Sequence, residues 1–326
     1  MSVFAGIDVS ARTVDMACRS AGKPSKVEQF KQTPQGHQAL IKQLTRLKPE
    51  CIVLEATGIY YLDLAVALAD AGLPVAVINP KSSRRFAELK LQTSKTDAAD
   101  ALLLAEYGER MQPALWTPPD PARLALRGIG RQLNRLIGAR TQARNRLHAL
   151  QATRSTPALL IEDEEEGIVT LERRIERLRQ AAHELMAQAP DLERLHQHFC
   201  AAAGIADASA LALLAELCVL PETLKANQVS RHAGLDVRIY QSGTSVRQTP
   251  RLSKAGNAYI RAALYMPVMS AVRHDPNAKA FYDALVGRGK KKMQAQCAVM
   301  RKYLTGLWAC MKTDTPFDSS KLFKPS

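Results

Sequence analysis

Five short apolar segments in the first eighty residues, separated by turn residues and amphipathic stretches, limit the folds that this chain can adopt. Each segment has the length of a β-strand and is too short for a buried helix. They cover residues 3–9, 14–18, 27–30, 51–54 and 74–78. The turn sequence Gly22-Lys23-Pro24 separates the second segment from the third. We therefore expect the first three strands to form a meander.

Helices are predicted between and after these strands, over residues 33–47, 59–71, 84–90 and 96–111. Pro34 suits the first position of the first helix, and Gly72 suits the end of the second. The order βββαβαβα joins a hairpin edge to parallel crossovers, which is the order of a ribonuclease-H-like domain. We predict such an α/β domain over residues 1–119, where a proline-rich boundary begins the rest of the chain.

The segment beyond this boundary, residues 123–152, is predicted to form one long helix of about 45 Å, at ~1.5 Å per residue. Residues 121–160 contain eight arginines and no acid. A ridge of one sign suits a phosphate backbone, whereas a solvated helix face usually mixes both signs. Four arginines recur at every fourth position and form such a ridge: Arg123, Arg127, Arg131 and Arg135.

A second helical segment follows, with apolar residues at alternating spacings of three and four. Together with the preceding helix, it predicts either an antiparallel helical hairpin or a dimerising coiled coil over residues 120–192. Residues 193–326 are predicted to form a mainly helical, basic domain. The apolar positions of the seam are Ile168, Leu171, Ile175, Leu178, Ala182 and Leu185.

Positive charge is concentrated near the end of the chain. The net charge is +14, and residues 227–326 hold 17 lysines and arginines against five aspartates and no glutamate. Such a surface indicates a nucleic-acid partner, and an aromatic content of only 5% favours phosphate contacts over stacked bases. The longest apolar stretch, 208–220, is interrupted by Glu216 and is too short to span a membrane. With no signal-peptide pattern at the start, we expect a cytoplasmic protein without membrane partners.

The six cysteines are far apart and are expected to be buried apolar residues rather than disulfides or zinc ligands. His196, His198 and Cys200 are close in sequence, but no second cluster completes a metal site around them. We therefore expect satisfied or solvated side chains at these three positions.

Four acids are candidates for a catalytic site. Asp8 lies in the first strand and Glu55 ends the fourth, and these strands are parallel neighbours in a ribonuclease-H-like sheet. Asp97 and Asp100, three residues apart near the start of a helix, share one face. Clustered carboxylates are favourable when divalent cations neutralise them, which points to two Mg²⁺ or Mn²⁺ ions and phosphoryl transfer. The alternative is that Asp97 only caps its helix and Glu55 is a surface residue.

Motifs along nearly the whole chain resemble those of DEDD insertion-sequence transposases, the bridge-RNA-guided recombinases with a RuvC-like N-terminal domain. Piv-type DNA invertases are related to them. The motifs are Gly6-Ile-Asp-Val-Ser10, Glu55-Ala-Thr-Gly58, Val77-Ile-Asn-Pro80, Lys95-Thr-Asp-Ala-Ala-Asp100, Ser242-Gly-x-Ser-Val-Arg247, Ser253-Lys-Ala-Gly256 and Arg261-x-x-Leu-Tyr-Met-Pro267.

This resemblance implies that Asp8, Glu55, Asp97 and Asp100 are the metal ligands and that Ser242 joins covalently to a DNA phosphate. It also implies a homo-oligomer, a dimer or tetramer, in which the serine and the acids of one site come from different protomers. A guide (bridge) RNA encoded by the element would pair with double-stranded donor and target DNA, in a bacterial, nucleoid-associated complex. One departure is Ala203-Gly-Ile-Ala206, where relatives have a Pro-Gly-Ile-Gly hairpin, so phosphate binding there is in doubt.

The residues themselves add roles around Ser242. A free serine needs a base or a metal to take its proton, and no histidine is near in sequence. Arg247, Arg251 and Lys254 are candidates to hold the phosphate, and the basic loop Lys290, Lys291 and Lys292 is a further nucleic-acid contact. The alternative is that Ser242 is a turn residue and that Ser245 or Ser253 attacks.

Other functions remain open on the sequence. A RuvC-type nuclease or junction resolvase would use the same acids with water as nucleophile, and a site-specific invertase would keep the serine. Gly6-Ile-Asp-Val-Ser10 also resembles the first phosphate loop of actin-like kinases, but no glycine-rich second loop follows. A nucleic-acid-binding structural protein would leave the acids without a role.

Overall fold

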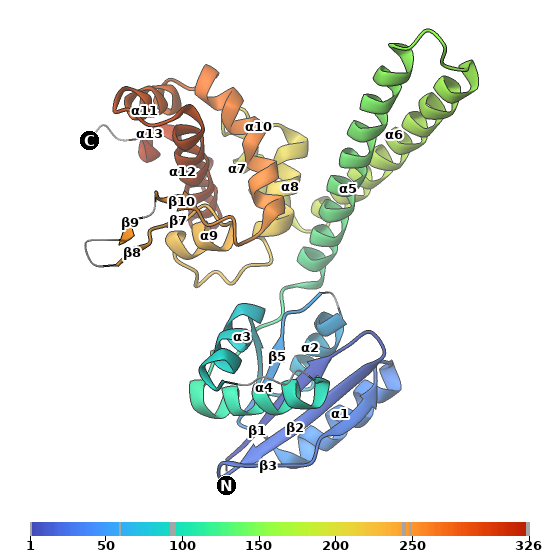
Figure 1. Ribbon diagram of the computed structural model, residues 1–326, viewed down its shortest axis with the longest axis vertical. Helices are drawn as coiled ribbons and strands as arrows, with labels where there is room; N and C mark the ends of the chain where they lie inside the picture. The colour runs from blue at the N-terminus through green and yellow to red at the C-terminus, as the bar shows by residue number, and fades with distance from the viewer. Residues whose placement is uncertain (1, 59, 92–95, 243–245, 248, 324–326) are drawn as a thin grey trace. The chain divides into compact units, whose positions relative to one another are not determined.

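The computed structural model describes residues 2–58, 60–91, 96–242, 246–247 and 249–323 (Figure 1). The chain divides into two compact units, Met1–Pro118 and Pro119–Ser326. The finer boundary expected between residues 192 and 193 stays a prediction. In the described part of the chain, no helix is both long enough and apolar enough to cross a membrane.

The first unit is built on a mixed six-stranded sheet with the order β3-β2-β1-β5-β6, in which β4 also pairs with β2. β1 is antiparallel to β2 and parallel to β5, and β5 is parallel to β6. The predicted meander, crossovers and ribonuclease-H-like topology are therefore confirmed. The strands are β1 (Val3–Val9), β2 (Thr13–Ser20), β3 (Lys23–Pro24), β4 (Glu28–Lys31), β5 (Cys51–Glu55) and β6 (Val75–Ile78).

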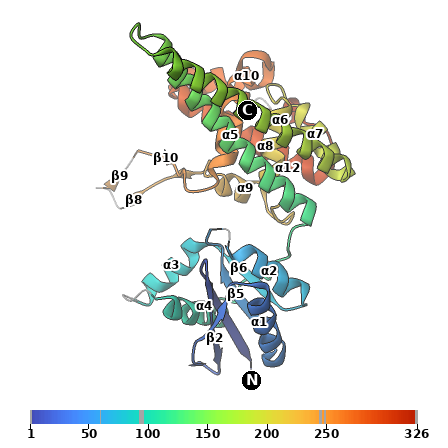
Figure 2. The ribbon, with the colours of Figure 1, turned by 90° about the vertical axis from the view of Figure 1, so that its right-hand side faces the viewer.

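Helices cover both faces of this sheet (Figure 2). Leu40 and Leu64, from the first two helices, join one apolar cluster with Ile7, while Leu104 of the fourth joins another cluster with Phe4 and Val53. The fourth helix therefore lies on the opposite face from the first two. The helices are α1 (Pro34–Leu47), α2 (Tyr60–Asp70), α3 (Pro80–Leu89) and α4 (Asp97–Met111).

Helix α4 approaches β1 closely because of Gly6. A Cβ atom at this glycine would lie 2.1 Å from the Ala105 nitrogen and 2.2 Å from the Ala101 oxygen, both backbone atoms of the helix. Backbone cannot move aside as the end of a flexible side chain can, so a larger residue would push the helix outward. Gly6 thus fixes the separation between the strand that carries Asp8 and the helix that carries Asp97.

The second unit begins with a hairpin of two long helices, α5 (Pro121–Gln151) and α6 (Ala158–Ala187), which pack along each other (Figure 1). Of the predicted seam, Ile168, Ile175 and Ala182 are buried, and the leucines between them are partly buried against the same core. The sequence left a hairpin and a dimerising coiled coil open, and the seam is used within one chain.

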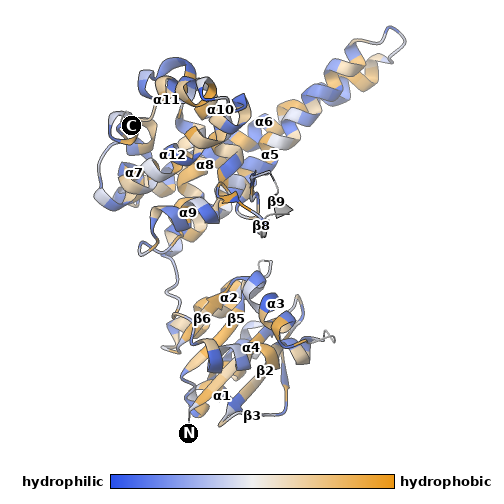
Figure 3. Ribbon diagram, turned by 60° about the vertical axis from the view of Figure 1, so that its left-hand side comes forward, coloured by the Kyte–Doolittle hydropathy of each residue, from blue (hydrophilic) through white to orange (hydrophobic). Residues whose placement is uncertain are grey.

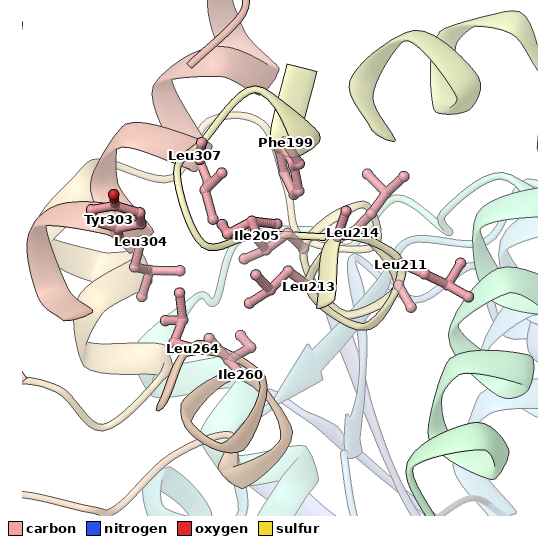
Figure 4. Packing of buried hydrophobic residues seen from close by; sticks show 14 of the residues in the cluster. Phe199, Ile205, Leu211, Leu213, Leu214, Ile260, Leu264, Tyr303, Leu304 and Leu307 are labelled. Atoms are coloured by element: carbon pink, nitrogen blue, oxygen red, sulfur yellow. The ribbon is translucent and has the colours of Figure 1, made fainter. Parts of the chain in front are cut away.

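The remaining helices pack around one apolar core, in which Phe199, Leu213, Leu264 and Tyr303 meet (Figure 4). Hydrophobic and hydrophilic residues alternate along these helices (Figure 3). The helices are α7 (Pro190–Cys200), α8 (Asp207–Leu217), α9 (Ala226–His232), α10 (Ala258–His274), α11 (Pro276–Gly287), α12 (Lys292–Thr313) and α13 (Ser319–Leu322).

Four short strands, not expected from the sequence, lie between α9 and α10. β7 (Val237–Arg238) pairs with β10 (Arg251–Leu252), and β8 (Gln241–Ser242) pairs with β9 (Val246–Arg247). The segment 240–247 therefore includes an antiparallel ladder. Two-residue strands give too little alternation to be recognised in a sequence.

Candidate active site

The four predicted acids line one cavity of about 700 Å³ in the first unit. Side chains alternate along a strand, so Asp8 shares the face of Gly6, and Glu55 shares the face of Val53. This is the face that α4 covers, and Asp97 and Asp100 stand in the first turn of that helix. The fold thus brings together carboxylates that are up to 92 residues apart in the sequence.

Thr96, and not Asp97, caps α4. The Thr96 side chain accepts a hydrogen bond from the Ala99 nitrogen at 3.2 Å, and Asp97 is the first helical residue. The alternative in which Asp97 serves only as the N-cap is therefore wrong. Asp97 and Asp100 lie in the first turn of α4, where the positive end of the helix dipole stabilises negative charge.

The pKa of Asp8 reflects the closeness of the other acids. Burial, followed by the charges of Asp100, Asp97 and Glu55 in that order of importance, raises the pKa of Asp8 to about 6. Among the described residues, no lysine or arginine forms an ion pair with Asp8 or Glu55. The cavity therefore carries negative charge that the surrounding side chains do not balance at these two positions.

Two hydroxyl groups hold the Glu55 carboxylate. Thr57 donates a hydrogen bond to Oε1, and Ser83 donates one to Oε2. Ser83 belongs to α3, is only 4% exposed, and also lies 3.0 Å from the carbonyl oxygen of Pro80. Because each oxygen has its own donor, the carboxylate is fixed from two sides. Neither residue could be predicted from the sequence, since nothing local distinguishes them from ordinary cap and turn residues.

A fifth acid, Asp15, lies beside the four and was also missed. It is the cross-strand partner of Asp8 in the β1–β2 register, is 6% exposed, and adds to the rise in the Asp8 pKa. Gln29 on β4 donates a hydrogen bond to it at 3.1 Å. The sequence did carry a signal, because an acid stands inside the apolar strand Thr13–Ser20.

The donor set suits a hard divalent cation such as Mg²⁺ or Mn²⁺ in kind, because it consists of carboxylates alone. In the described residues, however, no three His, Cys, Asp or Glu side chains are grouped tightly enough to bind one ion together. The four carboxylates therefore share one cavity without forming a single tight cluster among the described residues.

The second unit contains the predicted nucleophile, its alternatives and the predicted phosphate-binding cations. Ser242 lies on β8, where its backbone pairs with Val246 of β9. The side chains of Ser242 and Arg247, and the whole of Ser245, lie outside the described residues. The Ser253 hydroxyl donates a hydrogen bond to Asp236, so it is engaged elsewhere. A cavity at the β7–β10 pair is lined by further candidates, Arg251, Lys254 and Lys290, while Lys291 and Lys292 are exposed at the start of α12.

Acids from other helices pair with two arginines of the predicted ridge, Arg123 and Arg131. Arg123 donates to Asp191 at 2.9 Å, and Arg131 donates to both oxygens of Glu216, at 2.5 and 2.9 Å. Arg135 is exposed and contacts Gln132 on its own helix at 3.0 Å. The sequence could not indicate these pairs, because the acids are 68 and 85 residues away.

Glu216 is the centre of a buried polar cluster. It is 3% exposed and also accepts a hydrogen bond from the Asn257 amide at 2.6 Å. Burial raises the pKa of Glu216, but the hydrogen bonds from Arg131 and Asn257 outweigh it and hold the pKa below its usual range. The Arg131 guanidinium also lies 5.0 Å from the centre of the Tyr259 ring. Arg131 therefore joins α5 to α8 and α10.

The turn at Ala203–Ala206 ends at an acidic helix start. Gly204 has a φ of +84° and lets this turn pass close to α10, and Asp207 begins α8. The Asp207 carboxylate lies 2.9 Å from Arg179, 2.9 Å from His183 and 3.4 Å from His196. A carboxylate of the chain itself thus lies at the helix end where a phosphate would bind.

The other residues of the His-Cys trio have separate environments. His198 lies 3.2 Å from Asp314, and Cys200 lies 4.0 Å from Nδ1 of His196. The two histidines therefore contact different carboxylates. All six cysteines are free thiols, and four of them are buried.

The sequence is similar to those of known transposases and of proteins that invert a pilin gene. Residues 5–153 match the sequence model of a family described as a transposase of the DEDD, IS110 type, and residues 196–283 match that of the transposase IS116/IS110/IS902 family. The pilin gene-inverting protein of Moraxella bovis is 28% identical over 321 residues, which are 97% of each chain. The protein of the same name from Moraxella lacunata is 29% identical over 269 residues, 82% of this chain and 81% of that protein.

One solved structure is also similar. T. thermophilus RuvC in complex with a Holliday junction substrate aligns with 35% of this chain and 99% of its own, with 21% sequence identity and a TM-score of 0.29.

Proposed function

This chain belongs to the IS110-type family of DEDD transposases, and we propose that it recombines DNA of a mobile insertion sequence through a covalent serine–DNA intermediate. The observation that carries the proposal is the convergence of Asp8, Glu55, Asp97 and Asp100 on one cavity of a ribonuclease-H-like sheet. Carboxylates crowded into one cavity are unfavourable for folding alone, which favours a role in chemistry.

Asp8, Glu55, Asp97 and Asp100 would hold two Mg²⁺ or Mn²⁺ ions. When bound, such ions stabilise the charge on the attacking and leaving oxygens of a phosphodiester. The protein contributes the position of each carboxylate. Thr57 and Ser83 orient Glu55, and the close packing of α4 on β1 holds the helical acids over Asp8.

Ser242 would be the nucleophile in the second unit. Its position in the segment between α9 and α10, which also carries Arg251 and Lys254, supports this role, because cations near the serine would hold the phosphate and balance its developing charge. In the transfer, the serine oxygen forms a bond to phosphorus while the bond from phosphorus to a strand oxygen breaks. The serine proton passes to a base, and the leaving strand oxygen takes up a proton.

The test is the protein–DNA adduct. Wild-type protein incubated with DNA and Mg²⁺ is expected to give an adduct that survives denaturation, and Ser242→Ala is expected to give none. Ser253→Ala, the matched control, should keep the adduct because its hydroxyl is bonded to Asp236. An adduct that persists in Ser242→Ala and disappears in Ser253→Ala would contradict the assignment.

A guide RNA and an oligomer belong to the same proposal. The concentration of positive charge in residues 227–326 and the low aromatic content support a protein that grips phosphates and leaves sequence recognition to base pairing. A recombination assay with and without RNA transcribed from the DNA flanking the gene tests this part. Equal recombination in both reactions would remove the guide from the proposal.

A second candidate is site-specific inversion, because the match to the Moraxella bovis pilin gene-inverting protein extends over 97% of both chains. Inversion uses the same serine and acids, and differs in the DNA that is recombined. A plasmid carrying two inverted copies of the element end distinguishes the two: inversion reverses the segment between them, whereas transposition moves the element to a new site.

A third candidate, a RuvC-type nuclease or resolvase, would use water in place of the serine. It requires that Ser242→Ala still cleave DNA with Mg²⁺. Loss of both cleavage and the adduct in this variant would exclude it.

A further inference from the structure

The second unit contains a cavity of about 610 Å³ between β7, β10, α11 and α12. This volume is in the range of sites that hold a small organic group. Much of the wall is apolar, and it includes Leu235, Val237, Leu252 and Met293. An apolar wall of this kind suits an aromatic ring, because contact with the wall removes the apolar surface of the ring from water.

Four cations stand around the same cavity, namely Arg251, Lys254, Lys290 and Arg301. Among the described residues that line it, none is acidic. Within the described ranges, none of the four cations has a carboxylate within 4.0 Å, whereas Lys279 and Lys321 in the same unit are paired with Asp283 and Asp318. Cations that lack acidic partners and gather around one hollow attract an anion.

The chain between this cavity and Ser242 is short and carries exposed apolar side chains. Val237 belongs to the lining, and Val237, Ile239 and Tyr240 are 50%, 65% and 60% exposed. Five residues of extended chain span at most about 17 Å, at ~3.3–3.6 Å per residue, which is about five base steps of ~3.4 Å. Tyr240 offers a ring on which a base can stack.

We propose that this cavity binds an unpaired nucleotide of the DNA strand that Ser242 attacks. The base lies against the apolar wall, and the flanking phosphates lie on the four cations. The strand must be unpaired here, because a base inside a duplex cannot reach a recessed wall without leaving the stack. The inference deepens the proposed function and depends on it for the position of the attacked strand.

The test uses two labelled DNA octamers, dT8 and an octamer of the same phosphates with abasic sugars, and fluorescence anisotropy with full-length Ser242→Ala protein. We expect dT8 to bind about tenfold more tightly, as one or two well-packed bases would give. Ala298→Trp, which fills the cavity, should reduce this preference to about twofold or less. Ala309→Trp, on an exposed position of the same helix outside the lining, should retain it.

The role of the four cations is tested by the salt dependence of octamer binding. The pair Lys290→Gln and Arg301→Gln should lower the slope of log affinity against log salt by about 1.4, because each phosphate contact on a single strand contributes about 0.7. A control pair of cations outside the lining, Arg273→Gln and Lys312→Gln, should change the slope by less than half as much.

Three results would overturn the inference. These are equal affinity for dT8 and the abasic octamer, a preference that survives Ala298→Trp in a protein with unchanged thermal melting, or U8 binding that is tighter than dT8 and lost in Ala298→Trp. Met293→Glu, at a 55% exposed position, provides a second variant that should fold normally and weaken both octamers. Octamer binding needs no nucleophile, so its failure is distinct from a missing serine adduct.

Discussion

The hydroxyl group of Ser83 on α3 donates a hydrogen bond to Oε2 of Glu55 at the end of β5. The contact joins a helix that carries none of the four acids to a strand that carries one. It shows that the geometry of the acidic cavity depends on residues that do not themselves bind a metal in the proposed site.

Removing this hydrogen bond should slow the reaction without unfolding the protein. Ser83→Ala leaves Oε2 of Glu55 free to turn, and we expect a loss of about 10- to 100-fold in adduct formation, as for other groups that orient metal ligands. Ser82→Ala, the neighbouring serine, is the control and should be within about twofold of wild type. Single-turnover adduct formation at saturating Mg²⁺ measures both. Equal rates for Ser83→Ala and wild type would show that Thr57 alone orients the carboxylate.

The pKa of Asp8 predicts how stability depends on pH when divalent ions are removed by EDTA. Because folding raises the pKa of Asp8 from 3.8 to about 6, the folded state holds the proton more tightly. The corresponding stabilisation is complete below pH 4 and is lost as the pH rises through 6. Asp8→Asn should therefore melt at a higher temperature than wild type at pH 7, and the difference should vanish near pH 4.

Added Mg²⁺ or Mn²⁺ gives the complementary measurement. Either ion at pH 7 should raise the melting temperature of wild type and have little effect on Asp8→Asn. A melting temperature of wild type that is insensitive to both ions, with a normal response to pH, would argue against a metal site around Asp8.

The divided arginine ridge predicts that neighbouring arginines behave differently. Arg131→Gln leaves the buried Glu216 without its cation and should lower the free energy of unfolding by up to about 3 kcal/mol, the low end for an unpaired buried charge because Arg131 is 33% exposed. The double variant with Glu216→Gln should recover part of that loss. Chemical denaturation measures both.

Arg135→Gln, one helical turn away, provides the contrast. It should change the free energy of unfolding by less than about 0.5 kcal/mol, because the side chain is exposed. Its effect should be on duplex binding, where the salt slope is expected to fall by about 0.9. An unchanged slope would place the nucleic acid away from this part of α5.

A composite site predicts complementation between inactive proteins. Asp8→Ala keeps the serine, and Ser242→Ala keeps the acids, so a mixture should recombine DNA if one site takes these groups from different protomers. Each protein alone should be inactive. The control mixes either variant with the Asp8→Ala/Ser242→Ala double variant, which should restore nothing. No activity in the first mixture, under conditions where the subunits exchange, would place serine and acids of one site in the same protomer.

The order of elements and the four acids could be predicted from the sequence because both are local. Apolar periodicity located β1, β5 and α4, and the rule that parallel strands share an edge placed Asp8 beside Glu55. Asp15 could have been found in the same way, as an acid within a buried strand. Its role was missed because the register between β1 and β2 had not been fixed.

What the sequence could not supply were partners from distant segments. Glu216 pairs with an arginine 85 residues earlier, and Ser83 approaches Glu55 only when α3 lies over the end of β5. Long-range polar contacts of this kind depend on tertiary packing, which spacing along the chain does not encode. For the same reason the arginine periodicity of α5 was visible, but its division into paired and exposed members was not.

Gly6 has no side chain and no chemistry, yet it works as the spacer of the acidic cavity. Even one added methyl group would wedge α4 away from the sheet, and the helical carboxylates would retreat from the strand carboxylates as a set. The size of the ion that the cavity accepts and the rate of the reaction would then change together, although every proposed ligand remained in the sequence. Redesign of metal preference in a ribonuclease-H-like core of this kind could therefore begin at a residue without chemistry, with the distance between the helix and the sheet as the adjustable variable.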